Sequence, residues 1–254
     1  MGLIYCIDIG NTRTHCAVVD TRGYSVRESA DYPSADFAEI FAKRRLFERS
    51  GAQAASWCSV VPAYTAALSP LLEGLDAMQL TAAKSPLPIA IDEPSQLGQD
   101  RIADAVGAGH YFEPPYIVVD MGTAVTVDLV DASGSYAGGA IAPGMSAFVS
   151  YLGERAAQLP VINPAEADCS LVVGKNTLEA MYVGCAKGFC KLIDGIVADI
   201  ERDYFGGSGA AAKTIFTGGS VSYLPAGWLG GRKVDLHLSH IGLAKSYEFN
   251  RKNL

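Results

Sequence analysis

The stretch VVDMGTAVTVDLVD, residues 118–131, decides the fold of this chain, because it sets an acid, a glycine and two threonines between two apolar runs. The first run ends at Val119 and is β-branched, as is typical of a buried strand, and Asp120 follows where that strand is expected to end. Gly122 permits a tight turn whose backbone N–H groups approach a ligand, and residues 125–130 form a second strand. The alternative is an ordinary β-hairpin, since Asp and Gly are common turn residues.

The N-terminus repeats this pattern in YCIDIGNTRTHCAVVD, residues 5–20. The two stretches align without a gap at an acid, a glycine and a threonine, which pair Asp8 with Asp120, Gly10 with Gly122, and Thr14 with Thr126. Two copies predict a duplicated α/β domain, with the two acidic turns facing one another across a cleft. Such a cleft suits a nucleoside triphosphate and its metal, because glycine turns donate N–H groups to phosphates and carboxylates hold Mg²⁺.

The chain is long enough for two domains, with 254 residues and a hydrophobic content of 49%. We expect the boundary at the Glu-Pro-Pro segment, residues 113–115, which gives domains 1–114 and 115–254. No apolar run approaches the roughly 20 residues that span a bilayer. The start, MGLIYCIDIGN, lacks a basic segment and a small-residue cleavage site, so a cytoplasmic location is expected.

Charge and cysteine content argue against two classes of function. The net charge of −7 disfavours general nucleic-acid binding, which needs a basic face, so phosphates must be attracted locally by turns, helix ends and Mg²⁺. None of the six cysteines forms a CxxC pair, and we interpret them as small hydrophobes. His237 and His240 lack a third ligand nearby, which argues against a zinc site.

Strand and helix patterns alternate along the chain, as is typical of an α/β fold. The predicted strands cover residues 3–9, 15–20, 25–31, 55–61, 117–119, 125–130, 135–141, 213–216 and 234–238. The predicted helices cover residues 34–49, 63–72, 98–112, 145–158, 176–204 and 241–251. Ser34 is the expected N-cap of the first helix, and Gly51 follows its end.

A loop with three prolines, residues 84–98, leads to the sequence Gly-Gln-Asp-Arg at the start of the third predicted helix. Asp100 and Arg101 in this first turn suit a general base beside a bidentate anion binder, both held by a rigid helix end. The alternative is structural: Asp100 stabilises the helix N-terminus, and Arg101 is a solvated base.

Other glycines lie where the backbone can approach a ligand. TGGS, residues 217–220, follows a predicted strand and opens into a helix, which favours a phosphate or ribose contact. Gly138 and Gly139 are further positions of close approach. Neither GGSGAAAKT from Gly206 nor GKNT from Gly174 has the spacing of a Walker A loop, which argues against a P-loop kinase.

The motifs of this chain occur in the order and spacing of a known family. They are DIGNTRT at residues 8–14, SVVP at 59–62, EPSQLGQDR at 93–101, DMGTAVT at 120–126, GGAIAPG at 138–144, AAQLP at 156–160, GKNT at 174–177 and TGG at 217–219. Through them the sequence resembles the type III pantothenate kinases over almost its whole length. No single motif is decisive, but chance does not produce so many in the right order.

The resemblance implies the acetate and sugar kinase/Hsp70/actin fold, with two ribonuclease-H-like domains around a nucleotide cleft. It also implies ATP-dependent phosphorylation of pantothenate to 4'-phosphopantothenate, the first step of coenzyme A biosynthesis. The implied cofactors besides ATP are Mg²⁺ and a monovalent cation, K⁺ or NH₄⁺. The implied assembly is a homodimer, and we expect it to bind neither nucleic acid nor membrane.

The resemblance also assigns roles to residues, with Asp100 as the proton acceptor. The implied substrate contacts are Gly98, Gln99, Asp100, Arg101 and Thr177. The implied ATP contacts are Asp8, Ile9, Gly10, Asn11, Thr12, Arg13, Thr14, His15 and Thr123. The implied metal ligands are Asp120 for the monovalent cation and Asp8 for Mg²⁺, whereas the residues by themselves assign both acids to one Mg²⁺.

Three residues depart from the family's usual pattern: Glu93 stands in place of Asn, Gln99 in place of Ala, and Asp104 in place of Asn. An added carboxylate near an anionic substrate would weaken its binding. A second hypothesis is a non-catalytic regulatory relative on the same scaffold, which loss of the key acids or glycine turns would favour, but all are present. A third, an actin-like or Hsp70-like machine, is disfavoured because 254 residues leave little room for the insertions of those proteins.

Overall fold

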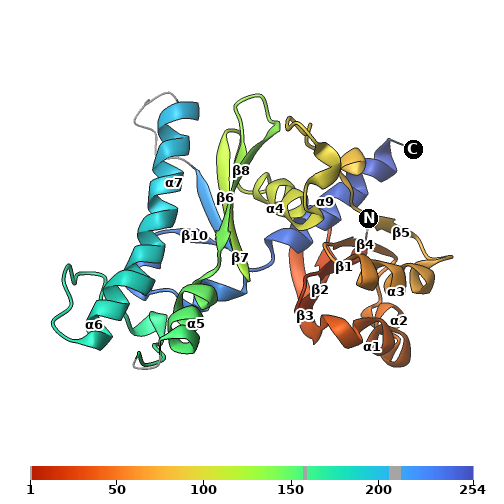
Figure 1. The fold of residues 1–254 in the computed structure, drawn as a ribbon. Helices are drawn as coiled ribbons and strands as arrows, with labels where there is room; N and C mark the ends of the chain where they lie inside the picture. The colour runs from red at the N-terminus through yellow and green to blue at the C-terminus, as the bar shows by residue number, and fades with distance from the viewer. Residues whose placement is uncertain (1, 157–158, 206–212, 254) are drawn as a thin grey trace. The chain divides into compact units, whose positions relative to one another are not determined.

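The computed structural model describes residues 2–156, 159–205 and 213–253, which fall into two compact units (Figure 1). Unit 1 comprises Met1–Pro114, Ala132–Ala137 and His237–Leu254, and unit 2 comprises Pro115–Asp131 and Gly138–Leu236. The first change of unit lies between Pro114 and Pro115. Residues 237–254, which the sequence assigned to the second domain, join unit 1 because the C-terminal helix packs on the first sheet.

Unit 1 contains a mixed sheet of five strands in the order β3-β2-β1-β4-β5. The strands are β1 (Leu3–Ile9), β2 (Arg13–Asp20), β3 (Ser25–Pro33), β4 (Ala54–Ser59) and β5 (Ala77–Gln79). β2 runs antiparallel to β1 and β3, whereas β4 is parallel to β1, and β5 to β4. The four strands predicted here are confirmed, and the short β5 was not predicted.

Helices cover both faces of this sheet. They are α1 (Phe37–Arg44), α2 (Leu46–Ser50), α3 (Pro62–Leu72), α4 (Gln99–Ala108) and α9 (Leu238–Lys252). Alternate side chains of a strand point to opposite faces, and Tyr5, Ile7 and Ile9 pack in one core with residues of α1 and α3. On the other face α4 and α9 lie side by side (Figure 1). Gly242 permits this close packing, because a Cβ there would overlap the Ala103 carbonyl group.

The first predicted helix differs from the structure at both its start and its middle. Ser34 is not an N-cap; it begins a 3₁₀ turn, η1 (Ser34–Asp36), and its hydroxyl lies 3.0 Å from the Thr14 hydroxyl. Arg45 adopts the left-handed region, with φ of 49°, and separates α1 from α2. Gly51 ends α2 with φ of 67°, as expected.

The proline-containing loop before α4 has only short regular segments. Two 3₁₀ turns lie in it or at its start, η2 (Ala82–Lys84) and η3 (Pro94–Gln96). Ile89 forms an isolated bridge with Tyr136, which belongs to the segment Ala132–Ala137 of unit 1. The bridge ties the loop to this segment. The predicted structured loop is therefore confirmed.

Unit 2 has the same strand order as unit 1, in a second sheet read as β10-β9-β6-β7-β8. Its strands are β6 (Tyr116–Met121), β7 (Ala124–Val130), β8 (Tyr136–Pro143), β9 (Thr214–Thr217) and β10 (Lys233–Val234). β7 is antiparallel to β6, whereas β9 is parallel to β6, and β10 to β9. The last predicted strand, 234–238, is too long, since Leu238 already begins α9.

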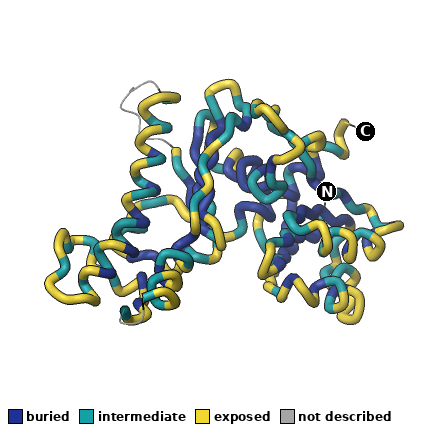
Figure 2. Tube along the Cα trace, viewed as in Figure 1, coloured by how far each residue is buried: buried dark blue, intermediate teal, exposed yellow. Residues whose placement is uncertain are grey.

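The helices of unit 2 are α5 (Met145–Arg155), α6 (Thr177–Met181), α7 (Gly188–Tyr204) and α8 (Ala226–Leu229), with 3₁₀ turns η4 (Pro164–Glu166) and η6 (Gly219–Tyr223). The predicted helix over residues 176–204 is continuous but contains a π-helical turn, η5 (Tyr182–Lys187), between α6 and α7. Buried and exposed residues alternate along α7, as its amphipathic pattern predicts (Figure 2). Three predicted segments lie partly outside the described residues: the end of the helix 145–158, the motif AAQLP, and the stretch GGSGAAAKT that starts at Gly206.

Within the part of the chain that the structure describes, no helix has the length and apolar character needed to cross a membrane.

Candidate active site

The first turn, between β1 and β2, places a half-buried acid next to exposed backbone. Asp8 is the last but one residue of β1, and the N–H of Gly10 donates to the Arg13 carbonyl at 3.0 Å to close the turn. Residues 11–13 are exposed. Among the predicted ATP contacts, residues 11–13 are therefore open to solvent, whereas Ile9 and Thr14 are buried and not accessible to a ligand in this structure.

A row of polar side chains crosses the sheet of unit 1 beside this turn. Asp8 pairs in register with His15 on β2 and with Cys58 on β4, and His15 pairs with Asp31 on β3. Register partners point to the same face of a sheet. His15 Nδ1 lies 2.7 Å from Asp31 Oδ1, and the Cys58 thiol donates to Asp8 Oδ1 at 3.3 Å. The row is thus linked at both ends by hydrogen bonds.

Two buried groups, one in this row and one in α9 near it, have shifted pKa values. Burial raises the pKa of the Cys58 thiol well above its usual value, and the nearby carboxylates of Asp8, Asp100 and Asp104 raise it further. Burial lowers the pKa of His240, in the first turn of α9, to about 4, although the charge of Asp8 opposes this shift. At neutral pH the thiol therefore keeps its proton and the imidazole of His240 is neutral.

The start of α4 holds Asp100, the predicted base, and Arg101, the predicted anion binder. The Arg101 N–H donates to Asp100 Oδ1 at 2.8 Å, which folds the carboxylate back over the helix start. A Cβ at Gly98 would lie 2.5 Å from the same oxygen, so glycine makes room for this orientation. The Arg101 guanidinium lies 5.8 Å from the centre of the Tyr136 ring, within the range of a cation–π contact.

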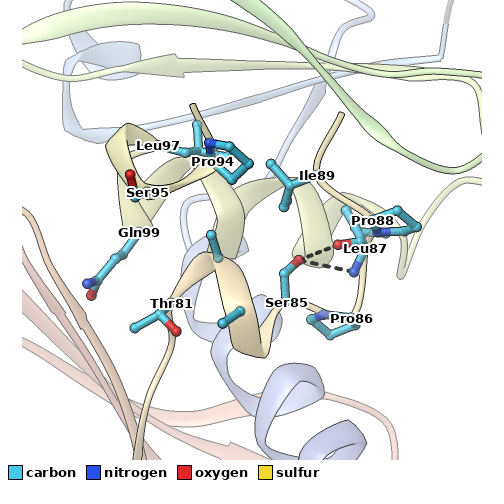
Figure 3. Close-up of a pocket in the computed structure, with 12 residues that line it drawn as sticks. Thr81, Ser85, Pro86, Leu87, Pro88, Ile89, Pro94, Ser95, Leu97 and Gln99 are labelled. Carbon is cyan, nitrogen blue, oxygen red and sulfur yellow. Dashed lines mark hydrogen bonds between the residues drawn. The ribbon is translucent and has the colours of Figure 1, made fainter. Parts of the chain in front are cut away.

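Gln99, also a predicted substrate contact, uses its side-chain carbonyl within the fold. Its Oε1 accepts from the Ser59 N–H at 3.0 Å and from Gln79 Nε2 at 3.2 Å, which ties the start of α4 to the ends of β4 and β5. Gln99 also borders a largely apolar pocket of about 790 Å³ formed by the preceding loop (Figure 3). The segment predicted to bind substrate therefore lies at the edge of a pocket within unit 1.

The second turn, between β6 and β7, resembles the first but is one residue shorter. Gly122 donates to the Ala124 carbonyl at 2.9 Å, and exposed Thr123 lies between them. Asp120 pairs with Thr126, whereas Asp8 pairs with His15. The predicted equivalence of Thr14 and Thr126 is therefore wrong, because the longer first turn moves the pairing by one residue.

Glycines pack closely around the second acid. Gly218 has φ of 95°, and a Cβ there would overlap Asp120 Oδ1 and the Met121 carbonyl oxygen. Thr217, just before it, pairs in register with Asp120 from the parallel strand β9. A Cβ at Gly144 would overlap the Gly122 carbonyl oxygen. The carboxylate thus lies beside backbone oxygens and a space that any side chain at residue 218 would fill.

The predicted substrate contact Thr177 lies in unit 2 and is exposed at the first position of α6. Asn176 caps this helix, with its side chain accepting from the Glu179 N–H at 2.9 Å, and Glu179 Oε2 accepts from the Lys175 N–H at 2.7 Å. These two bonds resemble a capping box, although Glu179 accepts from the residue before the N-cap, and they explain why the helix begins at the GKNT motif.

The sequence did not indicate a role for Cys58, because all cysteines were interpreted as small hydrophobes. Its thiol contacts Asp8, and the only hint in the sequence is its place just before the SVVP motif. Asp104, noted only as a departure, is buried and lies close enough to Cys58 to affect its pKa. Nowhere in residues 2–156, 159–205 or 213–253 do three His, Cys, Asp or Glu side chains gather to hold a metal ion.

Comparison with known proteins finds one family over most of the chain. The family model for type III pantothenate kinase matches residues 4–199. A type III pantothenate kinase of Acidiphilium cryptum is 35% identical over 87% of this chain and 85% of its own length. These two similarities extend through both units.

Solved structures agree on the fold. A protein of Campylobacter jejuni described as a Baf family transcriptional activator is 22% identical with a TM-score of 0.67, covering 98% of this chain and all of its own (100%). A protein of Sinorhizobium meliloti described as a 2-dehydro-3-deoxygalactonokinase has a TM-score of 0.57 at 12% identity, covering 97% of this chain and 99% of its own. The predicted pair of ribonuclease-H-like domains, the acetate and sugar kinase/Hsp70/actin fold, is confirmed. The chain belongs to the type III pantothenate kinase family.

Proposed function

We propose that this protein transfers the γ-phosphoryl group of ATP to pantothenate, giving 4'-phosphopantothenate in the first step of coenzyme A biosynthesis. Family membership supports the reaction, and the observation that carries it in this chain is the Asp100–Arg101 pair at the start of α4. Because the reaction uses ATP, the proposal includes a cytoplasmic location.

Asp100 accepts the proton that the primary hydroxyl of pantothenate loses as its oxygen attacks the γ-phosphorus. The hydrogen bond from the Arg101 N–H holds the carboxylate in one orientation. The Arg101 guanidinium is held by the Tyr136 ring and binds the pantothenate carboxylate. Arg101→Ala is therefore expected to raise the KM for pantothenate more than it lowers kcat.

The first turn binds the phosphates of ATP through its exposed backbone between Gly10 and Arg13. Mg²⁺ neutralises phosphate charge, and in proteins it is held by one or two carboxylates together with the phosphates of the substrate. Asp8 fits this role, because it is half-buried beside the turn and only its Oδ1 receives the Cys58 thiol. A site with a single carboxylate needs no cluster of protein ligands.

Unit 2 contributes Thr123 to ATP and Asp120 to a monovalent cation, K⁺ or NH₄⁺. The residues fit a weakly hydrated ion, because Asp120 Oδ1 and the Met121 carbonyl oxygen converge on the space beside Gly218. The exposed hydroxyl of Thr123 is available to the nucleotide. The exposed Thr177 is assigned to pantothenate.

A homodimer completes the proposal. Val161, Val172 and Val173 are 72–79% exposed, and Leu178, next to Thr177, is 44% exposed. Exposed apolar side chains of this size are common at protein interfaces, and an isologous dimer would bury them. A monomeric mass in solution at micromolar concentration, with activity retained, would contradict the dimer.

The reaction is tested with purified protein, ATP, Mg²⁺, K⁺ and pantothenate, and 4'-phosphopantothenate is measured by mass spectrometry. Product is expected from the native protein and not from Asp100→Asn at the same concentration. ATP binding is measured in parallel by calorimetry. A native protein that binds ATP but forms no product would favour the regulatory alternative.

A further inference from the structure

The thiol of Cys58 lies outside the proposed machinery, and a hydrogen bond joins it to Asp8, the proposed magnesium ligand. Cys58 is fully buried in β4, and its Sγ donates to Asp8 Oδ1 at 3.3 Å. A carboxylate can only accept, so the thiol supplies the proton of this bond. The bond lies within unit 1 and links two strands that are far apart in the sequence.

We infer that Cys58 is a positioning residue, which holds Asp8 Oδ1 so that the second oxygen, Oδ2, is directed to magnesium-bound nucleotide. The inference rests on the proposed function, in which Asp8 is the Mg²⁺ ligand. Cys58 itself touches neither metal nor nucleotide. Cys58 acts by fixing the orientation of the Asp8 carboxylate and by donating a hydrogen bond to its negative charge.

The charges around the thiol explain why Asp8 needs such a donor. Asp100 and Asp104 of α4 lie close enough to Cys58 to interact with it electrostatically, as Asp8 does. Like charges in a partly buried space repel one another, and a donor on Asp8 Oδ1 keeps that oxygen in place against this repulsion. Without the donor, the carboxylate is free to rotate, and its alignment toward a ligand is lost.

Unit 2 contains the same arrangement in a different chemical form. Asp120 pairs in register with Thr217 on the neighbouring parallel strand, as Asp8 pairs with Cys58. Both Cys58 and Thr217 are buried and carry a hydrogen on sulfur or oxygen. A buried residue with an S–H or O–H group, paired in register with the acid on its parallel neighbour, is therefore a repeated feature of the two sheets.

Three substitutions separate this role from simple packing. Cys58→Ala removes the donor, and Cys58→Ser replaces it with a hydroxyl donor of similar size. Cys6→Ala is the matched control, because Cys6 is also fully buried, lies on β1 in the same sheet and has its Sγ 3.9 Å from the Ile4 carbonyl oxygen, without a hydrogen bond to Asp8. Cys6→Ala thus leaves a similar cavity without a change at the acid.

The measurement is the Kd of ADP by titration calorimetry, with and without Mg²⁺, on the full-length protein. Cys58→Ala is expected to weaken binding of magnesium-bound ADP by roughly 3- to 10-fold, the range of one modest hydrogen bond. Binding of ADP without Mg²⁺ is expected to change by less than about 2-fold, since the phosphate turn is intact. Cys58→Ser and Cys6→Ala are expected to stay within about 2-fold of the native protein in both titrations.

The ratio of the two Kd values guards against a general loss of structure, because a partly unfolded variant loses both affinities together. An unchanged ratio in Cys58→Ala overturns the inference, and so does an equal loss in Cys58→Ser or Cys6→Ala. The failure of the proposed function is a separate result. A native protein that binds magnesium-bound ADP but makes no 4'-phosphopantothenate contradicts the proposed reaction, while the titrations still decide the role of Cys58.

Discussion

The two hairpin turns have the same strand order around them but different chemistry beside their acids. Asp8 lies between His15 and Cys58, whereas the acid of unit 2 lies between Thr126 and Thr217. The first turn has four residues between paired positions and the second has three. The duplicated scaffold thus keeps the acid and the glycine turn, and it varies the neighbours that tune them.

In the proposed function the two acids hold different ions. His15 and Cys58 flank the first carboxylate, and Asp100 and Asp104 of α4 lie near the Cys58 thiol, so this acid lies in the more highly charged region of the two, as the proposed magnesium nucleotide requires. Hydroxyl groups and backbone oxygens surround the second, and they suit a weakly hydrated monovalent ion. The comparison predicts that substitutions in the two units change different properties.

The largest effect is expected at Asp100, which belongs to unit 1. Asp100→Asn keeps the shape of the side chain but removes the proton acceptor, so kcat should fall by roughly 100-fold or more, or about 2.7 kcal/mol in activation free energy. The Kd of ATP should hardly change. Steady-state kinetics and calorimetry check both values. Asp92→Asn, a change at an exposed acid of the preceding loop, is the control, and near-normal kcat in Asp100→Asn would leave Asp8 as the next candidate base.

The glycines near the two acids are expected to differ in how much an added methyl group lowers the free energy of unfolding. Gly218→Ala should lower the free energy of unfolding by about 1–3 kcal/mol, because its positive φ and the overlap with Asp120 both disfavour a side chain. Gly10→Ala should cost less, since its Cβ would lie 3.1 Å from the Arg13 carbonyl oxygen. Gly122→Ala should be close to neutral, with its nearest contact at 3.5 Å.

Urea unfolding of the three alanine variants measures this order. Each is compared at the same pH and ionic strength, and the slopes of the unfolding curves verify that the unfolded states are comparable. Equal costs at Gly218 and Gly122 would show that the crowding around the second acid is not what the structure indicates.

The two acids should respond to different cations. Asp120→Asn is expected to raise the K⁺ concentration needed for half-maximal activity by about 10-fold, or about 1.4 kcal/mol, because the ion loses its charged ligand. Asp8→Asn should change the Mg²⁺ dependence and leave the K⁺ dependence as it is. Activity is measured over a series of KCl concentrations in Tris buffer. Full turnover of the native protein in Tris or sodium buffer without K⁺ would exclude the monovalent site.

Acid stability is expected to depend on unit 1, where all four histidines of the chain lie, and to change gradually with pH. Burial lowers the pKa of His240 to about 4 in the folded protein, from an ordinary value of 6.5 in the unfolded chain. The unfolded state therefore binds more protons between these values, and stability falls as pH falls through this window. The slope should stay below about 1.4 kcal/mol per pH unit.

His240→Leu tests this pH dependence, because leucine fills the buried site without a titratable group. The variant should lose less stability than the native protein between about pH 6.5 and pH 4 in urea unfolding. His110→Leu is the control, since His110 is exposed. An identical slope in His240→Leu would assign the acid sensitivity to other groups.

Much of the fold could be predicted from local pattern. The strands around Asp8 and Asp120 follow from β-branched residues and alternation, and the turns follow from glycine. Both patterns depend on neighbouring residues, which the sequence shows directly. The break at Arg45 and the π-helical turn η5 could not be predicted in this way, because packing against other elements overrides local helix preference.

The candidate site also combines features that are encoded locally with features that depend on the tertiary structure. The sequence by itself determined the acids, the glycine turns, the Asp100–Arg101 pair and the order of the motifs, since each is encoded within a few residues. Only the tertiary structure decided that His15 rather than Thr14 corresponds to Thr126, and that Cys58 donates to Asp8. Register between strands depends on turn length and on crossover connections, so one added residue in a turn changes which side chains meet.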